Sequence, residues 1–200
     1  MAYRRTPAVQ DRLAASRARI VDAAASLVSE HGYAGCSISA VAARADMGTG
    51  TVYRHFASKG ELFAEVFRIA CTREVDAVRA AHTDESAESV VASMLVFAHR
   101  ALRAPTMAYA LLVEPVDPLV EAERLAFRRA FRDSLAESID VAIDAGSIPK
   151  QDSAVTAACI VGAIAEALVM PLAHHVSSDA VTDSLATFVR RAIGIKQEMS

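Results

Sequence analysis

The sequence predicts an all-α protein, and three observations support this fold class. Hydrophobic residues make up 53% of the 200 positions, and many of them are alanine, the residue with the highest helix propensity. No segment alternates apolar and polar side chains as a half-buried strand does, and no Asn-Gly or Asp-Gly pair is present to form a hairpin turn. Glycine and proline are few, at 8 and 6 residues. The apolar content is sufficient for a large core or a subunit interface.

Residues 36–59 predict two short helices joined by a tight turn. Apolar side chains recur at helical spacing in both helices, so each has one face to bury. The second helix begins near Thr49, and its polar side chains face away from Val52 and Phe56; they are Thr49, Thr51, Tyr53, Arg54 and His55. A short helix that presents donors and acceptors and is held across a turn by another helix is the arrangement that enters the major groove of DNA. We therefore predict a helix-turn-helix over about 38–57.

Two further helices flank this segment in the prediction. The first begins within residues 13–16 and ends at His31, before a glycine that can stop it. The other is opened by a capping box, Ser58 and Glu61, and extends to about position 80. Lys59 lies in its first turn, where a cation opposes the helix dipole and costs a few tenths of a kcal/mol, roughly. A DNA phosphate would remove this cost, so Lys59 is a candidate phosphate contact.

Charge is unevenly distributed along the chain. Residues 1–60 contain eight Lys and Arg and four acidic residues, which gives a net charge of +4. The remainder contains 13 Lys and Arg and 20 acidic residues, which gives a net charge of −7. A basic end on an acidic body is expected of a polyanion-binding protein with a second function, although random surface charge also explains so small a difference. Residues 1–15 form a predicted flexible arm with Arg4, Arg5 and Arg12. The arm either reaches phosphates or the minor groove or is an ordinary solvated terminus.

The rest of the chain predicts four more helices by the same signals, over about 86–102, 117–145, 153–171 and 178–193. A short apolar segment, 107–113, lies between Pro105 and Pro115. The helix at 153–171 is apolar on nearly every side, so it must be covered on every side, and a partner subunit is a natural cover. The last two helices would then build a four-helix interface in a homodimer.

The same apolar helix contains one carboxylate, Glu166. Because Glu166 and Pro171 interrupt the apolar stretch Ala157–Ala173, we predict a buried helix and no membrane contact. A carboxylate in an apolar run needs a partner. An arginine across the dimer or water at a helix edge is favoured, and a cationic ligand group is the third alternative.

The cysteines and the N-terminus predict a cytoplasmic protein. Cys36, Cys71 and Cys159 are isolated, odd in number and without a C-x-x-C pair, which indicates free thiols in a reducing compartment. The polar N-terminal stretch lacks the apolar core of a signal peptide.

The motifs of several enzyme classes are missing. Gly48 and Gly50 do not form a phosphate-binding loop, because neither the following lysine nor a third glycine is present. His99, His174 and His175 lack the spacing of a metal site. No nucleophile elbow occurs either. We predict a protein that is not an enzyme and uses no cofactor or metal. An enzyme is the alternative class, followed by a helical adaptor, which predicts nothing for the surface of the second short helix.

Residues from about Arg17 to Ala70 resemble the DNA-binding domain of the TetR family of bacterial transcriptional regulators, the tetracycline-repressor type. The resemblance is greatest over residues 50–56, GTVYRHF, and continues through Ser58 and Lys59. Two positions depart from the family pattern. Asp46 stands where the turn usually has glycine, but Asp tolerates the left-handed conformation. Gly48 stands where a serine-type cap is usual and offers no side-chain oxygen.

The resemblance implies a set of DNA-contacting residues. Those at Ser37 and Lys59 contact phosphates, and the rest lie on the recognition helix against bases and backbone. The full set is Ser37, Thr49, Gly50, Thr51, Tyr53, Arg54, His55 and Lys59.

The resemblance also implies an architecture and a mechanism. After the arm, a DNA-binding domain at 16–76 would precede a larger ligand-binding and dimerisation domain at 77–200, about nine helices in all. The homodimer would bind a palindromic operator whose half-sites are one turn apart, roughly 34–36 Å, or a multiple of it. A small-molecule effector would lower DNA affinity by a coupling of about 1–3 kcal/mol. The helix over about 58–80 would link the two domains, and repression is the default.

The larger domain would hold the effector in an apolar pocket. We predict lining residues that are Met or aromatic on the helices that enclose ligand in the family: Met94, Phe97, Met107, Tyr109, Phe127, Phe131 and Met170. Each of them also fits a plain core role. Such a lining favours a hydrophobic or amphipathic effector.

Overall fold

The computed structural model describes residues 7–176 and 179–195. These residues form helices and no strand. The helices are α1 (Pro7–His31), α2 (Ile38–Arg44), α3 (Thr49–His55), α4 (Lys59–Ala81), α5 (Ala87–Arg103), α6 (Pro105–Leu112), α7 (Pro118–Asp144), α8 (Ser153–Ala173) and α9 (Asp179–Ala192). The predicted all-α fold with about nine helices is confirmed for the described part of the chain.

The start of α1 differs from the prediction. It begins at Pro7, so residues 7–15 of the predicted arm are helical, and residues 1–6 lie outside the described residues. Residues 8–15 contain Ala, Gln, Arg and Leu and no glycine, and these are strong helix formers that extend α1 backwards. The other predicted helix ends agree with the structure to within two residues.

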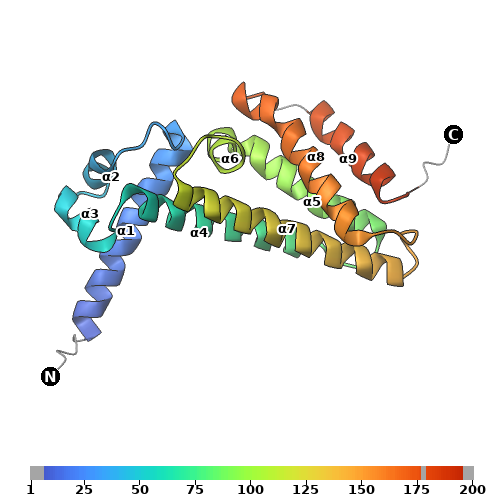
Figure 1. The fold of residues 1–200 in the computed structure, drawn as a ribbon, viewed down its shortest axis with the longest axis horizontal. Helices are drawn as coiled ribbons and strands as arrows, with labels where there is room; N and C mark the ends of the chain where they lie inside the picture. Colours follow the sequence, from blue (N-terminus) through green and yellow to red (C-terminus); the bar gives the residue numbers. More distant parts are fainter. Residues whose placement is uncertain (1–6, 177–178, 196–200) are drawn as a thin grey trace.

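The first three helices pack together at one end of the molecule (Figure 1). Ile20, Val52 and Phe56 join them and are no more than 1% exposed. The turn between α2 and α3 passes through Asp46 at a φ of 53°, which is the left-handed conformation expected at this position. Asp46 therefore supports the turn without glycine.

The larger part of the molecule is built around α4 and α7, which lie side by side along its long axis (Figure 1). α5 and α8 pack against α7. Between them lies an aromatic group in which the ring of Phe131 is 4.9 Å from that of Phe97 and 5.6 Å from that of Phe127, centroid to centroid. All three side chains are at least 90% buried, so they form part of the core that fixes α5 against α7.

α8 presents an apolar face to the outside. Val155 is 57% exposed and Met170 is 62% exposed, and Cys159 is also exposed between them. Phe188 of α9 is 39% exposed. By length and composition alone α8 is the one described helix that could cross a membrane, and one such helix is weak evidence for a span. An exposed apolar face of this kind is instead typical of an interface.

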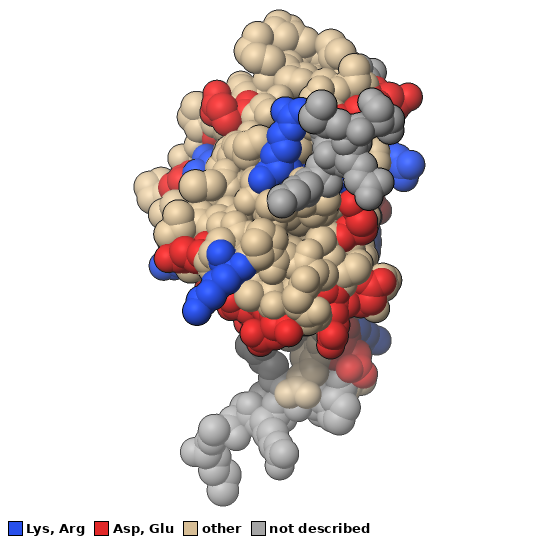
Figure 2. All heavy atoms as spheres, turned by 90° about the vertical axis from the view of Figure 1, so that its right-hand side faces the viewer, with Lys and Arg blue, Asp and Glu red and all other residues tan. Residues whose placement is uncertain are grey.

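The end of the molecule remote from α1, α2 and α3 is not basic. Figure 2 shows this end, where acidic side chains gather on the lower part and Lys and Arg side chains are scattered. Because a polyanion is attracted to a basic surface, the end shown is unfavourable for binding one.

Candidate nucleic-acid interface and ligand cavity

The orientation of α3 follows from two buried side chains. Val52 and Phe56 lie in the core at 0% and 1% exposure, so the remaining face of this seven-residue helix points outward. Thr49, Gly50 and Arg54 are exposed on it, and Tyr53 is 54% exposed. The exposed face therefore carries hydroxyl, guanidinium and phenol groups that can bond to base edges and phosphates.

Four of the predicted DNA-contacting residues border one open hollow of about 540 Å³. It is lined by Cys36, Ser37, Ile38, Ser39, Thr49, Tyr53 and Lys59. The hollow thus joins the start of α2, the start of α3 and the start of α4. Backbone N–H groups at the beginnings of helices favour anions, and a cationic side chain stands beside them.

Lys59 is held at the edge of this hollow by an aromatic residue. Its Nζ lies 4.4 Å from the centre of the Tyr33 ring and donates a hydrogen bond to the Tyr33 carbonyl at 3.4 Å. An ammonium group has three donors, and the structure uses one of them for a hydrogen bond among the described residues. Lys59 can therefore still donate to a phosphate.

Ser37 is also the N-cap residue of α2. Its Oγ accepts a hydrogen bond from the N–H of Ala40 at 3.1 Å and so caps α2. Its hydroxyl also lies 2.9 Å from that of Ser39. The N-cap of α3 is Gly48, which makes no side-chain bond there, as predicted.

The side chains of His55 and Thr51 are less exposed to solvent than those of their outward-facing neighbours on α3. The Nε2 of His55 is 3.1 Å from the hydroxyl of Ser16 on α1, so the ring turns toward α1. Burial lowers the pKa of His55, and Arg54 and Arg17 lower it further. The lowered pKa favours the neutral form of the ring. Thr51 is half-buried. The DNA-contacting roles of all eight residues stay predictions.

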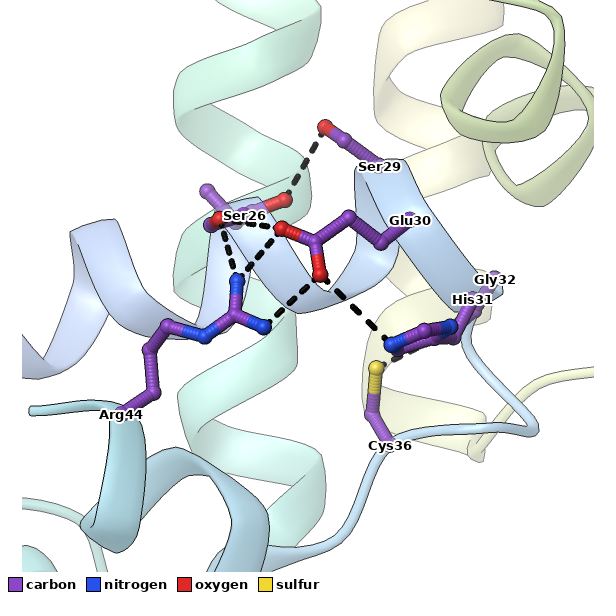
Figure 3. A network of polar contacts seen from close by, with 8 residues as sticks. Ser26, Ser29, Glu30, His31, Gly32, Cys36 and Arg44 are labelled. Atoms are coloured by element: carbon purple, nitrogen blue, oxygen red, sulfur yellow. Dashed lines mark hydrogen bonds and ion pairs between the residues drawn. The ribbon is translucent and has the colours of Figure 1, made fainter.

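A polar network fastens α2 to α1, and no sequence pattern indicated it. Arg44 of α2 forms a bidentate ion pair with Glu30 of α1, in which Nη2 lies 2.7 Å from Oε2 (Figure 3). Arg44 also donates a hydrogen bond to the Ser26 hydroxyl at 2.7 Å. The guanidinium of Arg44 lowers the pKa of Glu30 to about 2. Nearby, the Cys36 thiol bonds to the Gly32 carbonyl at 2.9 Å. These contacts fix the angle between the two helices.

A second contact that the sequence did not indicate joins the two parts of the molecule. The Glu114 carboxylate accepts hydrogen bonds from the backbone N–H groups of Tyr33 and Ala34, both at 2.8 Å. Glu114 follows α6, whereas Tyr33 and Ala34 lie between α1 and α2. The Tyr33 ring packs edge-on against Phe63 and Phe67 of α4, with centroids 5.3 and 6.3 Å apart. The loop before the helix-turn-helix is thus bound to both α4 and the end of α6.

Arg124 of α7 holds the end of α6 in place. Its guanidinium donates to the carbonyls of Leu111, Ala110 and Glu114 at 2.9, 3.1 and 2.6 Å. It also pairs with Glu121 at 2.8 Å. The carbonyls of Leu111 and Ala110 belong to the last turn of α6 and have no acceptor role within the helix, and that of Glu114 lies just beyond the helix end. Arg124 is 7% exposed and satisfies them.

A hollow with a volume of about 750 Å³ lies between α7 and α8. This volume is within the range of small-molecule sites. Three of the predicted ligand residues line it: Phe97, Phe127 and Phe131. Arg124 and Glu166 line it too.

The other four predicted ligand residues lie elsewhere. Met107 borders a small adjoining hollow of about 40 Å³. Met94 is 1% exposed in the core, and Tyr109 is half-buried. Met170 lies on the outer face of α8 at 62% exposure. The apolar pattern of the sequence could not distinguish pocket residues from core or interface residues, because the same residue types fill all three.

Among the described residues, no group of three or more His, Cys, Asp or Glu side chains could hold a metal ion.

Residues 20–66 match the family model for bacterial regulatory proteins of the tetR family. This segment contains most of α1, all of α2 and α3, and the start of α4. No protein of curated function matches the chain significantly.

Solved structures with the same fold include several bacterial regulators. The fatty acid degradation regulator FadR from Bacillus halodurans is 18% identical, with a TM-score of 0.75 over 98% of this chain and 100% of that one. FadR from Bacillus subtilis in complex with stearoyl-CoA is 18% identical, with a TM-score of 0.74 over 88% and 98%. RolR in complex with resorcinol is 20% identical, with a TM-score of 0.70 over 94% and 91%. At these identities the likeness establishes the fold.

Proposed function

By its N-terminal domain the chain is a member of the tetR family of bacterial regulatory proteins, and we propose that it represses transcription as a homodimer on a palindromic operator and releases DNA when a small molecule binds. The observation that carries the proposal is the outward face of α3 beside the hollow of Ser37, Thr49, Tyr53 and Lys59. Phosphate contacts position such a protein, and contacts from the recognition helix read the bases.

The homodimer is supported by the exposed apolar face of α8 and the adjoining α9. Val155, Met170 and Phe188 are each at least 39% exposed, which is unfavourable for isolated side chains of this size. A second copy of the same helices would bury these side chains in a four-helix interface. Two recognition helices related by a two-fold axis would then face two half-sites of the operator.

Effector control is supported by the cavity between α7 and α8 and by its connections. Arg124 lines the cavity and holds the end of α6, and Glu114, shortly after α6, binds the loop before α2. The long helix α4 packs against α7 and α1 and forms a second route. Some regulators of this fold bind small molecules, namely stearoyl-CoA in one case and resorcinol in another. A ligand that favours one position of α6 and α4 would shift the DNA-binding domain.

A gel shift with the purified protein and the DNA that flanks its own gene tests the proposal. We expect a discrete complex that resists nonspecific competitor and weakens as salt increases, because phosphate contacts release counterions. If flanking DNA gives no specific complex, selection from random-sequence DNA follows. Failure of both experiments would favour an adaptor or an enzyme.

A further inference from the structure

We propose that the cavity between α7 and α8 binds an amphipathic anion, with an apolar tail inside and an anionic oxygen head group at the guanidinium groups of Arg128 and Arg129. The proposal rests on the proposed function, because it names the chemical class of the effector. It starts from the lining, in which the apolar residues are Phe97, Leu112, Val113, Leu125, Phe127, Phe131, Ala158, Val161, Ala165 and Val169.

One wall of the cavity is a column of arginines. Arg124, Arg128 and Arg132 follow each other at four-residue spacing on α7, and Arg129 lies beside them. Residues four apart are neighbours on one helix face, and like charges at this spacing destabilise a helix. Arg128 therefore repels the arginines on either side of it in this column, and an anion bound there would offset the repulsion.

Two of these arginines are already engaged. Arg124 has three backbone carbonyls and the carboxylate of Glu121 as partners. Arg132 pairs with its neighbour Asp133 at 3.1 Å. Neither is free to take a head group without losing a partner.

The other two arginines carry available charge. Arg128 donates one long hydrogen bond, 3.3 Å, to the carbonyl of Leu112, and Arg129 makes no ion pair with any described residue. Both are exposed and line the cavity. Guanidinium groups bind carboxylate and phosphate oxygens with two parallel hydrogen bonds.

Glu166 is the opposing charge in the lining and the main argument for a cationic ligand. It is the one carboxylate among the lining residues. Because Glu121 and Asp133 already pair with Arg124 and Arg132, two unpaired guanidinium groups stand against this one carboxylate, and the balance of charge in the lining is positive. Substituting Glu166 therefore distinguishes an anionic ligand from a cationic one.

The direct test measures binding of four probes with one twelve-carbon tail by titration calorimetry on the full chain, below their micelle concentrations. The probes are dodecanoate, dodecyl phosphate, dodecanol and dodecyltrimethylammonium. We expect at least one anion to bind tenfold or more tightly than the alcohol and the ammonium compound. The carboxylate and phosphate arms distinguish the two head groups. Equal affinities, or tighter binding of the ammonium compound, would overturn the proposal.

Variants place the head group. Arg128→Gln/Arg129→Gln should remove most of the preference for the anion over dodecanol and leave dodecanol binding unchanged. Arg73→Gln, an exposed arginine of α4 outside the cavity lining, is the matched control and should keep the preference. Glu166→Gln should tighten anion binding severalfold. A double variant that keeps the full preference, or that alters only the dimer dissociation constant, would show that these arginines serve another purpose.

The outcome is separable from the proposed function. DNA binding is measured without any amphiphile, so a protein that binds its operator but not the anions would contradict this inference alone. A protein that binds the anions but no specific DNA would contradict the proposed function alone.

Discussion

The carboxylate of Glu114 lies 2.8 Å from the backbone nitrogen of Tyr33, across 81 positions of sequence, and at the same distance from the nitrogen of Ala34. Two hydrogen bonds to one charged acceptor connect the end of α6 with the loop that precedes α2. The carbonyl of the same Glu114 accepts from Arg124, which lines the cavity. These contacts connect the cavity between α7 and α8 with the loop before the helix-turn-helix.

Removing this carboxylate should loosen that connection. For Glu114→Ala we expect the free energy of unfolding in urea to fall by about 1–3 kcal/mol, because two backbone donors lose a charged acceptor. Effector binding should persist, and its effect on DNA affinity should shrink. Glu137→Ala, an exposed acid of α7, is the control. An unchanged coupling in Glu114→Ala would show that α4 alone connects the domains.

Acid should weaken the attachment of α2 to α1. The folded pKa of Glu30 is about 2, below its ordinary value of 4.5, because of Arg44. A lowered folded pKa stabilises the protein above the ordinary value, and this stabilisation is lost as the pH falls from about 4.5 to about 2. Wild type should therefore exceed Arg44→Ala in stability near neutral pH, and the difference should shrink over that window. Unfolding curves in urea at several pH values measure it, and a constant difference would contradict the account.

Lys59 should act on DNA through charge and Tyr53 through direct contact. Lys59→Ala should weaken DNA binding on all sequences and reduce the slope of log K against log salt by about one. Tyr53→Ala should lose affinity for the operator with little change in the slope. Fluorescence anisotropy at several salt concentrations measures both, and circular dichroism checks the fold. An unchanged affinity in both variants would place the DNA contact elsewhere.

The exposed thiol of Cys159 should report on the interface. Cys159 lies on the outer face of α8, whereas Cys36 and Cys71 are buried. Burial raises the pKa of Cys71 to about 12, so this thiol stays protonated and unreactive. If α8 forms the dimer interface, alkylation of Cys159 should slow as protein concentration rises. Cys159→Ser should abolish the fast phase, and a rate independent of concentration in a proven dimer would exclude this face.

The helices could be predicted from the sequence because their signals are local. Periodic apolar residues, the Ser58 cap and the stop at Gly32 each depend on a few neighbouring positions, and the structure contains them where expected. The prediction places the start of α1 too late, because residues 8–15 have high helix propensity but lack the apolar stripe on which the prediction depends.

The long-range polar contacts could not be predicted in this way. Glu30 meets Arg44 and Glu114 meets Tyr33 only after the chain has folded, and no local pattern indicates either pair. The arginine column on α7 is periodic and could have been found at its four-residue spacing. Its meaning depends on the cavity beside it, which needs the packing of α8.

A dimethyl sulfate footprint of the full-length protein on its selected operator tests the central claim most directly. The account predicts protection of guanine N7 in the major groove at two symmetric half-sites, with centres one turn apart, roughly 34–36 Å, or a multiple of it. The protection should disappear in Tyr53→Ala. A single asymmetric patch, or protection confined to the minor groove, would contradict a dimer that reads DNA through α3.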